Sequence, residues 1–224
     1  MKKYSVTIGM AGAGRATELH MEAYSRVKDV QLRYKKVLAK HYERAQAAVE
    51  RWGFEEAVHD FEELINDPEI DVIDICTPPY KHEEMIIRAL DAGKHVICEK
   101  PLTGYFGMEG DVSPIGKNVP KRKMYEELLV SMERIREAVD RSGKKFMYAE
   151  NFIYAPAVQK IAEVIAKKKS RILCLKGEES LKGSSSAVAG EWDKTGGGTF
   201  TRTGSHPLSA ILWLKQVEAK ARGV

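Results

Sequence analysis

The first half of the chain alternates short apolar runs with segments of helical period, and this alternation restricts the fold more than any other feature. Four apolar runs predict strands at residues 4–9, 30–39, 72–76 and 95–98. The segments around them predict helices at residues 14–27, 42–52, 60–65 and 81–92. Strands that alternate with helices of this length form parallel βαβ units, and right-handed crossovers then produce a doubly wound sheet. The predicted fold class is α/β.

The pattern changes near Glu150. Before it, the sequence predicts a long loop, a helix and a strand, at residues 103–123, 124–141 and 145–149. After it, the sequence predicts a helix, a strand and a final helix, at residues 157–168, 171–176 and 206–221, with a Gly/Ser-rich stretch before the final helix. We therefore predict a doubly wound domain over residues 1–150 and a second domain over residues 151–224.

Composition and charge exclude several classes of partner. Hydrophobic residues make up 43% of the chain and charged residues 30%, and the net charge is +4. Acidic and basic residues alternate, so the one-sided basic stripe of a nucleic-acid-binding protein is missing. No apolar stretch approaches the length of a membrane span, and the N-terminal apolar run is too short for a signal peptide. We expect a cytoplasmic protein without nucleic-acid or membrane partners.

The three cysteines argue against a thiolate metal site. Cys76, Cys98 and Cys174 form no Cys-x-x-Cys pair. Two of them follow apolar strand runs, as small core residues do. An odd number of unpaired cysteines is typical of a reducing compartment. We predict no metal site.

A glycine-rich turn joins the first predicted strand to the first predicted helix. Gly12-Ala13-Gly14 and the following Arg15-Ala16 match the start of the dinucleotide-binding fingerprint, although Thr17 replaces its third small residue. Gly12 permits the tight turn, and Gly14 lets a pyrophosphate approach backbone N–H groups at a helix N-terminus. A purely structural turn is the alternative. We predict that this loop binds the phosphates of NADP or NAD.

The end of the second predicted strand indicates which of the two dinucleotides is preferred. NAD-binding units place an acid there, which accepts hydrogen bonds from the ribose 2′-hydroxyl. In this chain the strand ends in Ala39-Lys40-His41, and Arg44 follows. Lys40, helped by His41 or Arg44, suits a 2′-phosphate, whereas a solvated lysine is the alternative. We therefore predict NADP over NAD.

With these features in order, the chain resembles the glucose–fructose oxidoreductase/inositol dehydrogenase/MocA (Gfo/Idh/MocA) family over residues 4–214. The motifs that carry the resemblance are Gly12-Ala13-Gly14 with His20, Asp67-Pro68 with Asp71-Val72, Thr77-Pro78-Pro79 with His82, Gly93-Lys94-His95 with Glu99-Lys100-Pro101, Pro156, and Gly196-Gly197-Gly198 with Gly204-x-His206. The resemblance implies a Rossmann domain, a second α/β domain, and hydride transfer between a nicotinamide and a sugar, cyclitol or related polyol. It also implies further contact residues, namely Thr77, Pro78, His82 and Glu99 for the cofactor and Asn151 for the substrate.

The resemblance assigns the reaction to Lys100 and His206. Lys100 follows a predicted strand, and ligands of doubly wound sheets bind at the carboxyl ends of the strands. An ammonium there can stabilise a developing alkoxide, while an exposed surface lysine is the alternative. Pro101 fixes the approach of the chain, and a cis peptide bond is one way to do so. His206 matches the family histidine that exchanges the hydroxyl proton, which its ordinary pKa suits.

Two features depart from the family pattern. Arg202 stands where the family often has an Asp four residues before the histidine, and arginine cannot accept a hydrogen bond. A guanidinium binds a carboxylate bidentately, so we predict that Arg202 contacts an acidic sugar; a side chain in solvent is the alternative. The chain also reaches Val224 soon after the last predicted helix, whereas family members continue with more strands. We expect an incomplete second domain.

The predicted function is that of an NAD(P)-dependent oxidoreductase acting on a hydroxyl of a sugar, cyclitol or sugar acid. One alternative is a glycosidase that oxidises its sugar transiently with bound nicotinamide. Another is a nucleotide-binding or assembly protein without catalysis, which Arg202 and the short second domain favour. An incomplete sheet leaves an edge or an apolar face, so we also expect a homo-oligomer.

Overall fold

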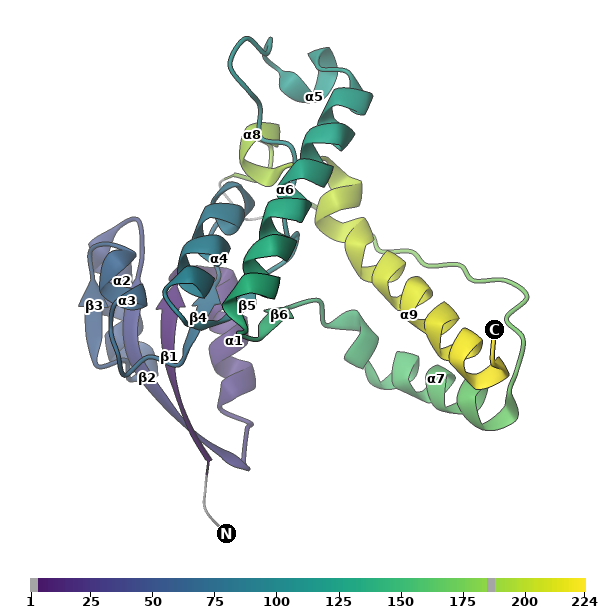
Figure 1. Ribbon diagram of the computed structural model, residues 1–224, viewed down its shortest axis with the longest axis horizontal. Coiled ribbons are helices and arrows are strands. Elements are labelled where there is room, and N and C mark those ends of the chain that lie inside the picture. The colour runs from purple at the N-terminus through teal and green to yellow at the C-terminus, as the bar shows by residue number, and fades with distance from the viewer. Residues whose placement is uncertain (1–3, 185–187) are drawn as a thin grey trace.

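A computed structural model describes residues 4–184 and 188–224 (Figure 1). Its centre is one sheet of six parallel strands in the order β3-β2-β1-β4-β5-β6. The strands are β1 (Tyr4–Ala11), β2 (Val30–Leu38), β3 (Glu56–Val58), β4 (Val72–Ile75), β5 (His95–Cys98) and β6 (Phe146–Tyr148). This is the doubly wound order. From β1 the chain first adds β2 and β3 on one side of the sheet, and it then adds β4, β5 and β6 on the other side. The predicted Rossmann fold is confirmed.

Helices cover both faces of the sheet (Figure 1). The helices of this part are α1 (Arg15–Tyr24), α2 (Tyr42–Trp52), α3 (Glu62–Ile65), the 3₁₀ turn η1 (Pro79–Lys81), α4 (His82–Asp91), α5 (Ile115–Asn118) and α6 (Lys121–Ser142). One core cluster joins Ile73 and Val96 of the sheet to Ile86 and Ile135 of α4 and α6. The other joins Met10 and other sheet residues to α1 and α2. Burial on both faces explains why β4 is apolar at three of its four positions.

Three short elements are absent from the sequence-based prediction. Strand β3 has only three residues, which pair with the end of β2. Helix α5 lies within the predicted loop 103–123, and α8 (Trp192–Thr195) packs near it. Tyr105, Ile115 and Met124 bury one another there, with Trp192 against them. None of these three elements shows a clear period in the sequence, so only tertiary packing defines them.

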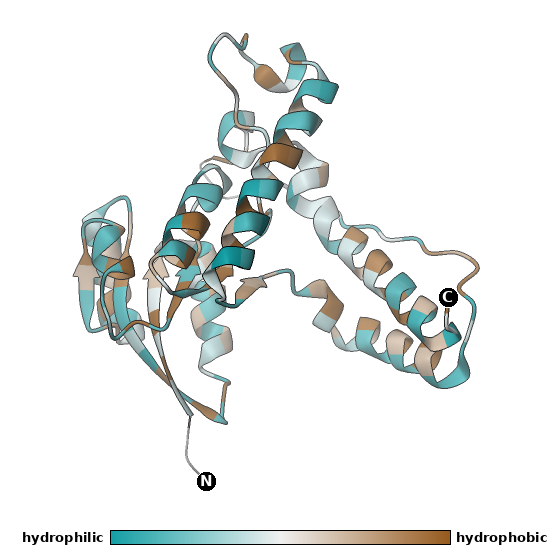
Figure 2. Ribbon diagram, in the orientation of Figure 1, coloured by the Kyte–Doolittle hydropathy of each residue, from teal (hydrophilic) through white to brown (hydrophobic). Residues whose placement is uncertain are grey.

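The C-terminal segment is a pair of long helices that projects from the sheet (Figure 1). Helices α7 (Pro156–Lys168) and α9 (Ser205–Arg222) pack through Ala162, Ile165 and Leu214. Apolar residues recur along both helices (Figure 2). The 3₁₀ turn η2 (Phe152–Tyr154) precedes α7, and the π-helical turn η3 (Phe200–Gly204) leads into α9.

The predicted strand at residues 171–176 does not form. These residues are extended, but no described strand lies beside them to pair their backbone groups. Ile172 and Leu175 pack against the helix pair instead, and the Ile172 N–H donates to the carboxylate of Glu218 at 2.8 Å. A strand needs a hydrogen-bonding neighbour, and within 151–184 and 188–224 the chain supplies none. The division into two domains at residue 150 stays a prediction.

None of the helices in the two described ranges is both long and apolar enough to cross a membrane.

Candidate cofactor and catalytic site

The glycine-rich loop lies where β1 meets its two neighbours at their carboxyl ends. The Gly12 N–H donates to the carbonyl of Leu38 at 2.7 Å, and the Thr17 hydroxyl donates to the Gly12 carbonyl at 2.9 Å. Gly12 has a φ of +124°, and a Cβ there would lie 2.6 Å from the carbonyl oxygen of Cys76. Only glycine combines this backbone conformation with so close an approach.

The N-terminus of α1 is open in front of this loop. Gly14 precedes α1 without a side-chain cap, and no atom lies within 4 Å of a Cβ built on it. The first N–H groups of a helix have no partner within the helix, and together with the helix dipole they favour an anion. Ala13 and Gly14 border a cavity of about 220 Å³, which Arg44 and Arg51 of α2 also line. These residues fit the phosphates of a dinucleotide.

Basic side chains follow β2 beside this loop. Ala11 pairs with Leu38, so the residues after β2 begin next to Gly12. Lys40, His41 and Arg44 are all exposed, and no acid lies between Leu38 and α2. The exposed Arg15 pairs with Glu18 at 2.9 Å, whereas the half-buried Ala16 offers only backbone and a methyl group. The structure thus brings the predicted phosphate loop and the predicted basic group together.

Lys100 is held at the carboxyl end of β5. Its ammonium donates to the carbonyl of Arg202 at 3.0 Å, and its backbone N–H donates to the Glu99 carboxylate at 2.8 Å. The side chain is half-buried, and the Lys100–Pro101 peptide bond is cis. Because a fixed acceptor receives the ammonium, the alternative of an exposed surface lysine does not hold.

His82 is fully buried, which corrects the expectation that it contacts the cofactor. Its two ring nitrogens lie 2.9 Å from the carbonyl oxygens of Pro101 and Thr77. Burial lowers the pKa of His82, although both carbonyl contacts act in the opposite direction. His82 therefore holds the Thr77 loop against the Lys100–Pro101 turn. Thr77 and Pro78 are half-buried at the carboxyl end of β4 and retain surface for a ligand.

His206 is oriented by a carboxylate that the sequence analysis does not identify. Its Nδ1 lies 2.8 Å from Oε1 of Glu150, and its ring stacks on Phe152 with centroids 4.3 Å apart. The Phe152 N–H also donates to this oxygen at 3.0 Å. With Nδ1–H donating to Glu150, Nε2 of His206 is left to exchange a proton with a ligand. The available signal was an acid directly after the last strand of a parallel sheet.

Arg202 lies in the π-helical turn just before His206. Its Nη1 donates to the carbonyl of Ala189 at 3.0 Å, and the residue is half-buried, so the side chain does not simply extend into solvent. Its own carbonyl accepts the Lys100 ammonium, which links the end of β5 to the turn that carries His206. Asn151 is exposed beside Glu150. The predicted contacts of Arg202 and Asn151 with a substrate stay predictions.

A second turn of glycines also brings the two parts of the chain together. Gly196 has a φ of +73°, and its carbonyl accepts the N–H of Tyr105 at 2.9 Å. The backbones of Gly104 and Gly196 approach so closely that a side chain on either would clash. The Gly196-Gly197-Gly198 motif thus packs against the segment that follows Lys100 and Pro101.

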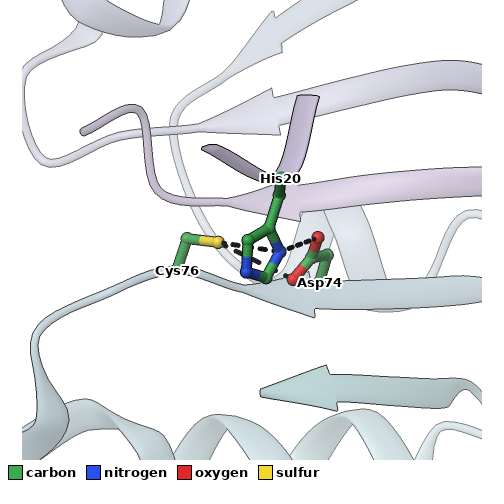
Figure 3. A group of neighbouring side chains, drawn as sticks. All are labelled: His20, Asp74 and Cys76. Atoms are coloured by element: carbon green, nitrogen blue, oxygen red, sulfur yellow. Dashed lines mark hydrogen bonds and ion pairs between the residues drawn. The ribbon is translucent and has the colours of Figure 1, made fainter. Parts of the chain in front are cut away.

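One group of side chains in the described residues has the composition of a metal site. Figure 3 shows the ring of His20, from α1, between Asp74 and Cys76. His20 Nδ1 lies 2.8 Å from Oδ2 of Asp74 and 3.6 Å from Sγ of Cys76. Burial opposes the charged form of His20, but its hydrogen bonds to Asp74, Cys76 and Glu99 raise its pKa to about 12. Burial and the Asp74 charge raise the pKa of the Cys76 thiol to about 12.

Known proteins share both the sequence pattern and this geometry. Residues 6–108 match the Gfo/Idh/MocA oxidoreductase family, described by its NAD-binding Rossmann fold. Levoglucosan dehydrogenase of Pseudarthrobacter phenanthrenivorans is 39% identical over 104 residues, which cover 44% of this chain and 27% of that protein. Myo-inositol 2-dehydrogenase of Thermotoga maritima is 35% identical over 96 residues, which cover 43% of this chain and 28% of that protein.

A solved structure matches over a longer range. Levoglucosan dehydrogenase in complex with NADH and levoglucosan superposes with a TM-score of 0.74 and 25% identity, covering 94% of this chain and 54% of the other. The chain thus spans about half the length of that relative. The motif order, the strand order and these matches agree, so residues 6–108 of the chain are similar to the NAD-binding Rossmann domain of the Gfo/Idh/MocA oxidoreductase family.

Proposed function

We propose that this chain binds NADP or NAD and transfers a hydride between the nicotinamide and a hydroxyl-bearing carbon of a sugar, cyclitol or sugar acid. The observation that carries the proposal is the contact between the Lys100 ammonium and the carbonyl of Arg202. It joins the end of β5, at the same edge of the sheet as the dinucleotide loop, to the turn that presents His206. Related proteins named for levoglucosan and myo-inositol support a sugar-like substrate.

The chemistry divides between Lys100 and His206. A nicotinamide held by the glycine-rich loop would supply the acceptor for the hydride of the alcohol carbon. Lys100 donates a hydrogen bond to the reacting oxygen and stabilises the negative charge that develops on it. His206 takes the hydroxyl proton on Nε2, while Glu150 holds Nδ1–H and fixes the orientation of the ring. The reverse reaction returns the proton from His206 to the carbonyl oxygen.

NADP is the proposed preference. Lys40 and His41 follow β2 beside the loop, and Arg44 lies one turn into α2. A 2′-phosphate carries up to two negative charges, which these exposed cations can neutralise. An acid that would repel the phosphate is missing between Leu38 and α2.

A cytoplasmic homo-oligomer completes the proposal. All three cysteines are free, which suits a reducing compartment. Strand β6 is an edge strand, and its Met147 and Tyr148 are each 40% exposed. Beside it, an apolar groove is lined by residues that include Leu129, Val130 and Phe146. A second copy could cover this face, and light scattering at micromolar concentration tests it, because a strictly monomeric species contradicts the proposal.

Two glycine substitutions test cofactor binding, with nicotinamide fluorescence as the measurement. Gly12→Val should remove binding, since its side chain would meet the Cys76 carbonyl and strain the loop. Gly14→Ala is the more specific test, because its methyl group contacts no protein atom and would contact only a bound phosphate. Gly190→Ala, also without neighbours, is the matched control. Unchanged affinity in both loop variants contradicts the proposed binding site.

Turnover is tested on the wild-type chain with bound NADP or NAD. A panel of polyols and sugar acids should change nicotinamide fluorescence through oxidation or reduction of the cofactor. A net change in the redox state of the cofactor indicates a dehydrogenase. A glycosidase that oxidises its sugar only transiently leaves the nicotinamide in its original redox state after each turnover. Binding without any redox change on the whole panel would favour the nucleotide-binding protein without catalysis.

A further inference from the structure

Four polar side chains, of which Asp74 is buried and the other three are partly buried, form a row between α1 and the end of β5. The Tyr24 hydroxyl donates to Oδ2 of Asp74 at 2.6 Å, and His20 Nδ1 lies 2.8 Å from the same oxygen. On the other side of the ring, His20 Nε2 lies 3.3 Å from Oε1 of Glu99. The second oxygen of Glu99 accepts the backbone N–H of Lys100. The row therefore ends at the proposed catalytic lysine.

The two carboxylate partners of His20, rather than the hydrogen-bond geometry alone, set the charge of its ring. Both ring nitrogens face carboxylate oxygens, and ionised carboxylates only accept hydrogen bonds. Neutral imidazole has a single N–H, so only imidazolium can donate to both partners. Asp74 has no exposed surface, and a carboxylate so buried requires a compensating charge. The charges and titratable groups that face the ring are Asp74 and Cys76 at β4, Glu99 after β5, and Tyr24 on α1.

The same geometry disfavours a metal ion at this cluster. Ligand atoms bound about 2.0–2.1 Å from one tetrahedral ion lie roughly 3.4 Å apart. His20 Nδ1 and Asp74 Oδ2 are 2.8 Å apart, which is a charge-assisted hydrogen-bond distance. A zinc ion would also require Cys76 as thiolate, against its raised pKa of about 12. A shared proton explains the contacts without displacing either group.

We propose that His20 is a permanent imidazolium that bridges Asp74 and Glu99 and thereby positions the backbone of Lys100. The proposal rests on the proposed function only in that Lys100 is taken as catalytic. Because His20 and the phosphate-binding N-terminus belong to one helix, α1, the bridge links the dinucleotide site to the proposed catalytic lysine. His20 is a positioning residue, since its side-chain hydrogen-bond partners among the described residues are Asp74, Glu99 and Cys76 rather than the glycine-rich loop or Arg202.

Stability should depend on pH in a direction that follows from this charge. The pKa of His20 is near 6.5 in the unfolded chain and about 12 in the folded chain. Its contribution to the free energy of unfolding is therefore complete below pH 6.5 and declines as the pH rises towards 12. The difference in unfolding free energy between wild type and His20→Gln should shrink over that range. His59→Gln, which replaces an exposed histidine outside this row, is the control.

Nitrogen NMR of ¹⁵N-histidine-labelled protein tests the charge directly. The His20 signal, identified by its loss in His20→Gln, should show two protonated ring nitrogens at pH 8.5, whereas an ordinary histidine is neutral there. Asp74→Asn should restore titration towards neutral pH. Equimolar Zn²⁺ should leave the signal unchanged. A neutral His20 at pH 8.5, or a zinc-induced shift that Cys76→Ser removes, would overturn the proposal.

The positioning role has its own measurement. In His20→Gln the Lys100 amide resonance should move, because Glu99 loses the partner that fixes its carboxylate, while His59→Gln should leave that resonance in place. An unmoved Lys100 amide refutes positioning even if His20 is charged. This readout needs no turnover, so failure of the proposed dehydrogenase activity leaves it intact.

In turnover, His20→Gln should lower kcat by up to about 100-fold, as misplacement of a catalytic group does, with little change in dinucleotide affinity. His20 lowers the pKa of Glu99 against the effect of burial. The part of the acid limb of the kcat profile that is due to Glu99 should therefore shift to higher pH in His20→Gln, while the part due to His206 stays in place. An unchanged kcat and an unchanged Glu99 part of the limb would contradict the link to Lys100.

Discussion

The parallel sheet and the α7–α9 helix pair bury their apolar residues in different ways. In the sheet, Met10, Ile73 and Ile75 have no exposed surface, because helices cover both faces. In the helix pair the buried cluster has three members, while Ile161, Val164 and Leu212 remain about half exposed. The sheet therefore fixes the residues at its edge by burial, whereas the helix pair needs specific contacts with that edge.

Those contacts concentrate at the proposed site. His206 is joined to Glu150, which is the second residue after the end of β6. The Arg202 carbonyl is joined to Lys100, which follows β5 and Glu99. Each contact ties a residue just beyond the sheet to one in the turn before α9 or at its start. Substitutions at these contacts should consequently change turnover, whereas substitutions in the glycine-rich loop or just after β2 should change cofactor binding.

The largest effect is expected at the sheet edge. Lys100→Met should lower kcat by more than about 10³-fold, because it removes the only ammonium that the motifs place at the reacting oxygen. Nicotinamide fluorescence should still report near-normal dinucleotide affinity. Lys117→Met, on an exposed lysine of α5, is the control. If Lys117→Met and Lys100→Met have equal activity, the sheet edge does not carry the chemistry.

The next effect belongs to the start of α9. His206→Asn should lower kcat by about 10²–10⁴-fold, the usual span for one general acid–base group. Glu150→Gln keeps a hydrogen-bond acceptor near Nδ1 but removes the charge that stabilises the imidazolium, so a smaller fall is expected. The pH dependence of kcat should lose its histidine limb in His206→Asn alone. Retention of that limb would assign proton exchange to another group.

The comparison also explains how far the sequence could predict the structure. The doubly wound sheet follows from local patterns, since each strand carries its own apolar run and each helix its own period. The π-helical turn and the Glu150–His206 pair do not, because they depend on where residues 56 positions apart meet. The unpaired segment 171–176 failed as a strand for the same reason: its apolar pattern says nothing about a neighbour.

His20 illustrates a further difference. The motif order includes this histidine but gives it no role, because its partners lie far from it in the sequence, Asp74 on β4 and Glu99 just after β5. The site residues that follow directly from sequence are those whose work is local, such as the turn at Gly12. Residues such as His20, whose partners lie on or after other strands, became evident only from the interatomic distances in the structure.

A substitution that changes the choice between NADP and NAD should have a smaller effect, and it lies on the sheet side of the molecule. Lys40→Asp should reverse a preference for NADP over NAD, weakening NADP binding by about tenfold or more. A charge-assisted hydrogen bond to a phosphate contributes about 1.5–3 kcal/mol, and the new carboxylate adds repulsion. Dissociation constants for both dinucleotides, measured by fluorescence titration, check the expectation. A several-fold preference of the wild-type chain for NAD would show that the residues after β2 do not read the 2′-position.

The smallest effect should separate substrates, on the helix-pair side. Within residues 4–184 and 188–224, the side chain of Arg202 donates one hydrogen bond, from Nη1 to the Ala189 carbonyl, so its other N–H groups can bind an anion. If they bind a substrate carboxylate, Arg202→Ala should raise KM for uronates or other sugar acids by about tenfold, since one charge-assisted hydrogen bond is lost. KM for neutral polyols should barely change, because the carbonyl that receives Lys100 belongs to the backbone and remains. Arg202→Lys keeps the charge but not the planar fork, so an intermediate KM for acids is expected. Equal effects of Arg202→Ala on acidic and neutral substrates would mean that this arginine only braces the loop around Ala189.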